Sequence, residues 1–212
     1  MAMTLRDLLS SDSSVGAGTS RRALLRALGT TPIAASAAVT SPWGAALAAL
    51  HAEHADEPAF LCRSREGRSL SRFRYHRAES FFQTIEAGIL TSNDEILYYS
   101  GIVAQLALSG HLLDIGFEDE WCACHIGLRV AKGLAYANAT GLGHACPDMA
   151  RLAAVLTPYW KWRQPRWDEP MPADGGFTAE EVHPLLRALL NRVHEATGHR
   201  RPNGWRRRWG GR

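Results

Sequence analysis

The segment from Ile96 to Ile115 constrains the fold more than any other part of the chain, because Asp114 is its only formal charge. Apolar or small residues recur in it at helical spacing and form one continuous stripe on the helix surface: Ile96, Tyr99, Val103, Leu106, Gly110 and Leu113. Ile102 and Leu112 widen this stripe. A helix that is apolar on nearly all sides has to be covered by the rest of its domain. The sequence therefore predicts a central helix from Asn93 to about Asp114.

A membrane-spanning helix is the alternative interpretation of this segment, since about twenty apolar residues can cross a bilayer. Several polar residues dilute its apolar character, namely Ser100, Gln105, Ser109, His111 and Asp114. The composition favours burial inside a helical bundle.

Capping patterns, prolines and glycines divide the remaining chain into further helices. Ser92 with Glu95 and Thr178 with Glu181 are capping boxes, and Pro147 suits the first position of a helix. Residues 41–58 are expected to form a short helix or a linker. The other expected helices are one from about Ser71 to Gly88, the central helix, one from Glu118 to about Asn138, one from Pro147, and one whose regular part begins near His183 and closes at Gly198. A chain of 212 residues suffices for one domain with a core. We therefore predict an all-α single domain, a small bundle of about four to five helices with an irregular Trp/Pro-rich loop at 159–172 and disordered termini.

The segment from Phe60 to Arg77 permits two structures. Glu66-Gly67 could form the turn of a β-hairpin, or the segment could be a loop that leads into the helix from Ser71. We favour the helix, which would place Phe73, Phe81 and Ile85 near one face.

Charge is segregated along the chain, although the net charge is only +3. Residues 63–77 carry six arginines and one acid, residues 79–150 carry nine acids and two bases, and six more arginines follow His199. Complementarity within the chain is the favoured interpretation, and binding of an external polyanion is the alternative. Tail residues that could contact an acidic protein, nucleic acid or an anionic membrane surface are Arg200, Arg201, Arg206, Arg207 and Arg208, next to Trp205 and Trp209.

The N-terminal part carries an address pattern. Ser20-Arg21-Arg22-Ala23-Leu24-Leu25-Arg26 precedes a moderately apolar stretch that ends near the small-x-small site Ala35-Ser36-Ala37. This pattern resembles the twin-arginine signal of bacterial export, with Ser20, Arg21, Arg22, Leu24 and Leu25 in the matching positions. The resemblance implies a signal peptide at 1–37, the twin-arginine export machinery as a partner, and an exported, periplasmic protein. The helix patterns and the arginine-rich end divide the remaining chain into a helical domain at 38–198 and a basic disordered tail at 199–212. A cytoplasmic protein with an amphipathic N-terminal helix is the alternative.

One constellation of metal-capable residues stands out, formed by Cys122, Cys124, His125, His144 and Cys146. Thiolate and imidazole ligands suit zinc or copper, and the candidate ligands are Cys124, His125, His144 and Cys146. A gap of one residue on a helix points Cys122 and Cys124 about 200° apart, so both cannot reach one ion. Structural cysteines are the favoured interpretation, a metal site and a redox pair or disulfide are the alternatives, and no cofactor is predicted.

No motif in the sequence defines a reaction. Nucleophile-elbow, Walker and dinucleotide-binding patterns are absent, and the Glu-x-x-His spacing of Glu180 and His183 lacks the second copy that a di-iron bundle needs. His51 and His54 share a helical face and are expected to be solvent-exposed. The sequence predicts an exported binding or scaffolding domain rather than an enzyme. The alternatives are a cytoplasmic adaptor that uses its basic arm and tail, and a small metal-dependent Cys/His protein.

Overall fold

The computed structural model describes residues 42–157 and 173–202, which all belong to one unit of the chain, Ala37–Arg212. These residues form seven α-helices and one π-helix, and the described residues contain no strand. The elements are α3 (Gly44–His54), α4 (Arg65–Glu86), α5 (Asn93–Ile115), α6 (Asp119–Trp121), the π-helix η1 (Cys122–Ile126), α7 (Val130–Ala139), α8 (Pro147–Leu156) and α9 (Ala179–Thr197). The all-α prediction is confirmed, with more helices than the four to five expected.

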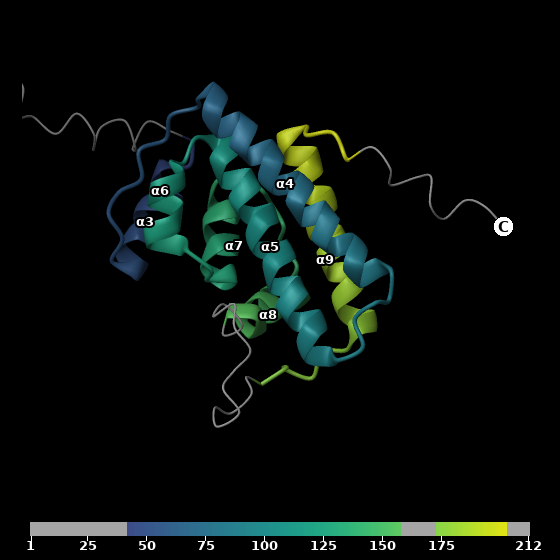
Figure 1. The fold of residues 1–212 in the computed structure, drawn as a ribbon. Helices are drawn as coiled ribbons and strands as arrows, with labels where there is room; N and C mark the ends of the chain where they lie inside the picture. Colours follow the sequence, from purple (N-terminus) through teal and green to yellow (C-terminus); the bar gives the residue numbers. More distant parts are fainter. Residues whose placement is uncertain (1–41, 158–172, 203–212) are drawn as a thin grey trace, which may run out of the picture. The chain divides into compact units, whose positions relative to one another are not determined.

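Helix α5 is the centre of the bundle, as its composition predicted. It contacts α4, α7, α8 and α9, and Figure 1 shows these helices around it. Ser92 caps its first turn, where the Ser92 side chain accepts a hydrogen bond from the Glu95 amide at 3.2 Å. The helix is long and apolar enough to cross a membrane, but 72% of its most apolar window is buried inside the bundle. Leu106 is only half-buried, whereas Leu108 and Leu112 are buried.

Gly116 ends α5 and also lets the segment that precedes α4 pack closely against the end of this helix. Its φ of 115° lies in the left-handed region that favours glycine. A Cβ added here would come within 2.8 Å of the Cys62 backbone, and the Cys62 amide donates to the Gly116 carbonyl at 2.8 Å. Any side chain at this position would therefore have to displace the backbone at Cys62 and Arg63.

Helix α4 begins at Arg65, earlier than expected, because the Ser64 side chain caps it by accepting from the Gly67 amide at 2.9 Å. The hairpin alternative for this segment is wrong. The shared face expected for Phe73, Phe81 and Ile85 does not form, since Ile85 is buried whereas Phe73 is 57% exposed. The buried residues of α4 are Ser71, Tyr75, Ala78, Glu79, Phe82 and Ile85.

A buried ion pair explains why the apolar pattern misplaced the inner face of α4. The Glu79 side chain is fully buried and pairs with Arg187 of α9 at 2.9 Å. The Tyr75 hydroxyl donates to the same carboxylate at 2.7 Å. A charged residue can face the core when a partner satisfies it, so polarity alone did not reveal the face.

The predicted continuous helix from Glu118 to about Asn138 is wrong. The chain forms α6 and η1, breaks at Gly127 with a φ of 57°, and restarts as α7 at Val130. Gly133 of α7 packs close to its neighbours, because a Cβ there would lie 3.5 Å from Ile126 and 3.6 Å from Leu108.

The C-terminal helices begin as their caps indicate. Pro147 opens α8, and Met149, Leu152 and Leu156 of that helix are buried. Helix α9 starts at Ala179, where the Thr178 amide donates to the Glu181 carboxylate at 3.0 Å, and it continues through Pro184. The regular part thus begins earlier than His183, the expected start.

His199 belongs to the packed domain rather than to a tail, since it is only 2% exposed. Its Nε2 lies 2.6 Å from the Ser71 hydroxyl and 3.7 Å from Asp114. The export pattern at Ser20–Leu25, the Trp/Pro-rich loop and the tail arginines Arg206, Arg207 and Arg208 lie outside the described residues.

Candidate functional site

The π-helix η1 is the irregular element next to which the candidate site forms. The Gly127 amide donates to the Cys122 carbonyl, five residues earlier, at 2.8 Å. One-turn π segments inside helices are frequent at functional sites. In η1 the wider turn sends Cys122 and Ile126 to one side, into the core, and His125 to the other.

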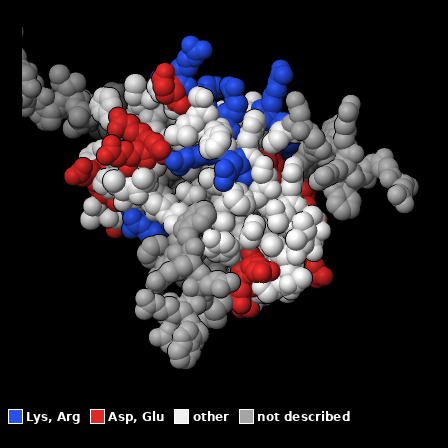
Figure 2. Space-filling model, viewed as in Figure 1, with Lys and Arg blue, Asp and Glu red and all other residues white. Residues whose placement is uncertain are grey.

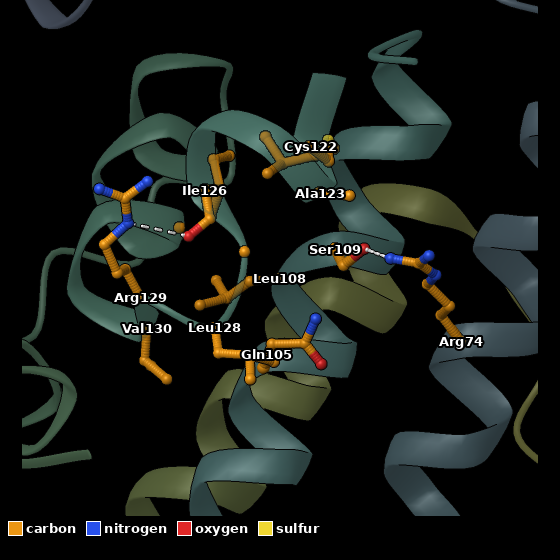
Figure 3. Close-up of a pocket in the computed structure, with 13 residues that line it drawn as sticks. Arg74, Gln105, Leu108, Ser109, Cys122, Ala123, Ile126, Leu128, Arg129 and Val130 are labelled. Carbon is orange, nitrogen blue, oxygen red and sulfur yellow. Dashed lines mark hydrogen bonds between the residues drawn. The ribbon is translucent and has the colours of Figure 1, made fainter. Parts of the chain in front are cut away.

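A cavity of about 280 Å³ lies on the core side of η1. Figure 3 shows Leu108 and Leu128 between Arg129 at one side of the cavity and Arg74 at the other. The lining comes from α4, α5, η1 and α7 with the turn between them: Arg74, Gln105, Leu108, Ser109, Leu112, Cys122, Ala123, Ile126, Gly127, Leu128, Arg129, Val130 and Gly133. Most of these side chains are apolar, and the polar groups stand at the edges.

The two arginines of this cavity differ in their partners. Arg74 donates to the Ser109 hydroxyl and pairs with the Asp119 carboxylate. Arg129 instead donates to two backbone carbonyls, to His125 at 2.6 Å and to Ile126 at 3.2 Å. No carboxylate pairs with Arg129 among the residues that the structure describes. Arg129 is therefore held in place by η1 while its positive charge is not neutralised.

Cys122 forms part of the cavity wall as a neutral thiol. Burial raises the pKa of Cys122 to about 12, with a smaller opposing effect from Arg74. A thiol becomes a nucleophile or a metal ligand only as the thiolate. Cys122 therefore contributes apolar surface to the cavity at neutral pH.

A buried polar network lies on the opposite side of η1. One Asp56 oxygen accepts from Lys132 at 2.7 Å, and the other accepts from the Tyr136 hydroxyl at 2.6 Å. His125 Nδ1 lies 3.5 Å from Asp56, and the His125 ring stacks on Trp121 at 4.7 Å. We call Asp56, Trp121, His125, Lys132 and Tyr136 the Asp56 network. It ties the segment before α4 to η1 and α7.

The Asp56 carboxylate stays ionised in this setting. Burial by itself would raise the pKa of Asp56, but the hydrogen bonds from Lys132 and Tyr136 and the Lys132 charge outweigh it, so that the pKa is lowered. The pKa of Tyr136 is raised, mainly by burial and then by its bond to Asp56. Asp56 therefore stays ionised and Tyr136 stays neutral near neutral pH. Their hydrogen bond acts as a structural clamp between the segment before α4 and α7.

The structure separates the candidate metal ligands. Cys124 is exposed, and His125 belongs to the Asp56 network. His144 and Cys146 follow the far end of α7, where the His144 amide donates to Asn138 at 2.8 Å. The ten residues of α7 span about 15 Å between the two pairs. Among the described residues, no group of three or more His, Cys, Asp or Glu side chains could hold a metal ion.

The cysteine geometry follows the spacing argument. Cys122 is buried and Cys124 is exposed, as a one-residue gap predicts. All four cysteines, at 62, 122, 124 and 146, are free thiols.

The tail candidates and the histidine pair are placed as follows. Arg200 is exposed, and Arg201 donates to Asn191 at 2.5 Å. His51 and His54 do share a face, but both are half-buried, with ring centroids 5.7 and 6.2 Å from that of Tyr136. The expectation that they are fully solvent-exposed is wrong.

Sequence reasoning missed Asp56, Lys132 and Arg129 as site residues. Lys132 carried a usable signal, because it is an isolated charge inside the apolar segment Val130–Ala139 and had to find a partner. Nothing in the sequence indicated that the partner is Asp56, seventy-six residues earlier.

Comparison with protein-family models, with curated protein sequences and with solved structures finds no match for this chain. The functional assignment therefore depends on the geometry of the site.

Proposed function

We propose that this domain binds a small, mainly apolar molecule that carries one anionic group, in the cavity beside η1. The observation that supports it is an apolar cavity of about 280 Å³ with an arginine at its edge that no described carboxylate neutralises. Small-molecule sites are concave and mostly apolar, with a few polar groups that fix orientation. This cavity has that composition, at the small end of the usual size range.

The bound molecule would lie with its apolar part against Leu108, Ile126 and Leu128 and its anionic group at Arg129. Removing apolar surface from water contributes roughly 25 cal/mol per Å². A guanidinium that is already held by two carbonyls loses little freedom when it contacts a carboxylate. Charge and apolar contact thus act at different ends of one ligand.

Binding fits this cavity better than catalysis does. The described lining contains no histidine, aspartate or glutamate that could act as general acid or base, and its only thiol is neutral. The nearby titratable groups of the Asp56 network face the other side of η1.

The test compares decanoate with decanol, which has the same apolar chain but no charge, by isothermal titration calorimetry. Decanoate is expected to bind at one saturable site, and decanol more weakly. Arg129→Gln should weaken decanoate binding roughly tenfold, because a charge-assisted hydrogen bond contributes about 1.5–3 kcal/mol. The same variant should leave decanol binding unchanged. Arg129→Lys should retain part of the decanoate affinity.

The matched control is Arg151→Gln, which removes the same charge from an exposed side chain of α8. It should change neither affinity. Equal weakening by Arg129→Gln and Arg151→Gln would contradict the proposed site, as would the absence of saturable binding of both ligands.

We further propose that the domain acts outside the cytoplasm. The pattern at Ser20, Arg21, Arg22, Leu24 and Leu25 supports this, together with the small-x-small site that follows. Replacing Arg21 and Arg22 with lysine should leave an uncleaved precursor in the cytoplasm, as immunoblots of cell fractions would show. Unchanged fractionation of the variant would contradict export by the twin-arginine route.

A further inference from the structure

A row of basic side chains runs along α4. Arg65, Arg68, Arg72 and His76 are spaced three, four and four residues apart, which places them on one face of the helix. The three arginines are exposed, with the Arg68 side chain 54% accessible. Eleven residues of helix separate the ends of the row, or about 16 Å.

The C-terminal segment lies against this row and extends it. His76 Nε2 donates to the Arg200 carbonyl at 2.8 Å, and Arg68 donates to the Thr197 carbonyl at 3.4 Å. His199 is buried beneath, within 2.6 Å of Ser71. Two basic segments far apart in the sequence are thereby joined. We call Arg65, Arg68, Arg72, His76 and Arg200 the arginine row.

Most of the charge in the arginine row is not neutralised by the domain. Arg68 pairs with Asp114 at 3.1 Å, which agrees with the charge complementarity between the basic segment 63–77 and the acidic segment 79–150. Within the described residues, Arg65, Arg72 and Arg200 form no ion pair. Figure 2 shows basic side chains gathered along the upper edge of the domain, where α4 begins in Figure 1.

An exposed aromatic ring stands beside the row. Phe73 follows Arg72 in the sequence and is 57% exposed. The Arg77 guanidinium lies 5.9 Å from the centroid of its ring. An accessible phenyl ring next to arginines offers a base a surface to stack on.

From these contacts we propose that the arginine row binds the phosphate backbone of single-stranded nucleic acid, with Phe73 stacking on a base. The planar guanidinium contacts two phosphate oxygens at once, which the point charge of lysine does not. All charged bases of the row are arginines. Its length of about 16 Å accommodates several successive phosphates.

The surroundings favour a narrow partner over an anionic membrane. Acidic side chains lie beside the basic edge in Figure 2. A flat surface would bring these acids against its own negative charge, whereas a single strand can follow the row alone. Phe73 by itself also offers little apolar area for insertion into lipid.

The experiment measures fluorescence anisotropy of a labelled oligothymidylate with the full chain at several salt concentrations. Binding is expected to weaken with salt, and Arg65→Gln/Arg72→Gln should lower the affinity roughly tenfold and flatten the log–log salt slope by about 1.4. Arg65→Lys/Arg72→Lys should keep the slope and lose part of the affinity. Phe73→Ala should weaken binding without changing the slope.

Controls separate this proposal from its rivals. Arg151→Gln, on α8, should have no effect, and melting curves should show that each variant is folded. A chain ending at Pro202 tests the remaining arginines. Loss of binding on that truncation together with no effect of the Arg65/Arg72 variants would overturn the proposal. So would tighter binding to vesicles of phosphatidylglycerol than to the oligonucleotide, or no binding to either.

Discussion

The two sides of η1 are built on opposite principles. On one side Asp56 joins Lys132 and Tyr136 through hydrogen bonds of 2.7 and 2.6 Å, so the polar groups are satisfied by one another. On the other side apolar side chains surround a cavity of about 280 Å³, and Arg129 donates to the backbone carbonyls of His125 and Ile126 while no carboxylate of the described residues pairs with it. The satisfied side holds the turn in place. The side that is left unfilled is the one that can accept a ligand.

Lys132→Met breaks the satisfied side and should have the largest effect. It leaves the Asp56 carboxylate, whose side chain is only 6% exposed, without its main partner. Breaking a buried ion pair costs about 3–5 kcal/mol, whereas replacing both partners by apolar residues is often nearly neutral. Chemical denaturation should therefore show a large loss for Lys132→Met and substantial recovery in Asp56→Leu/Lys132→Met. A single variant as stable as the wild type would contradict the clamp.

Leu108→Ala acts on the cavity side and should come next. Leu108 is buried and lines the cavity, so its truncation costs about 2–5 kcal/mol. The matched change Leu106→Ala, at a half-buried position of the same helix, should cost less. Thermal melts of the two variants check this, and equal shifts would show that the cavity wall is not part of the core.

The buried residue His111 and the Asp56 network should lose their contributions to stability at different pH values. Burial lowers the pKa of His111 to about 4 from an ordinary 6.5, so the unfolded chain binds more protons between these values and stability falls as pH drops through them. The slope for one proton is at most about 1.4 kcal/mol per pH unit. The pKa of Asp56 is lowered from 3.8, so its contribution is lost only at more acidic pH.

His111→Leu tests this order. The variant should lose the His111 share of the pH dependence between about 6.5 and 4, while the shares of His51, His144 and His199, whose pKa values burial also lowers, persist. The loss at more acidic pH, to which Asp56 contributes, should persist as well. Denaturation midpoints measured across this pH range give the comparison. An unchanged profile in the variant would exclude His111 as the titrating group.

The sequence predicted the parts of this fold that local pattern decides. The apolar circumference of α5, the Ser92 and Thr178 caps and the Pro147 start all depend on neighbours in the chain. The break at Gly127 was missed, because glycine is also tolerated inside a helix, as Gly133 shows.

Long-range partners limited the rest. The inner face of α4 depends on Arg187, and the position of Lys132 depends on Asp56, both far away in the sequence. The metal-ligand prediction assumed that Cys124 and His125 approach His144 and Cys146, but α7 stands between the two pairs. Arg129 could not be distinguished from a surface arginine, since only the turn of η1 places it at the cavity.

A pair of glycine substitutions should give the smallest effects and the cleanest comparison. Gly133→Ala adds a methyl group at the cavity wall, within ordinary contact of Ile126 and Leu108. Gly101→Ala, on α5, adds a methyl group that lies 4.0 Å from the backbone carbonyl of Leu156 on α8. Each should gain up to about 1 kcal/mol of stability from helix propensity. Only Gly133→Ala should weaken decanoate binding, and equal affinities would indicate that the ligand does not reach this wall.

The most direct test of the two-sided account is a nuclear magnetic resonance titration of the labelled domain with decanoate. The account predicts that amide shifts concentrate around the cavity, at Leu108, Ser109 and the 126–130 segment, with smaller changes at Asp56 and Tyr136. Arg129→Gln should reduce these shifts at equal ligand concentration. Shifts centred on Asp56 and Tyr136, or scattered over the surface without saturation, would contradict the claim that the apolar side of η1 is the binding site.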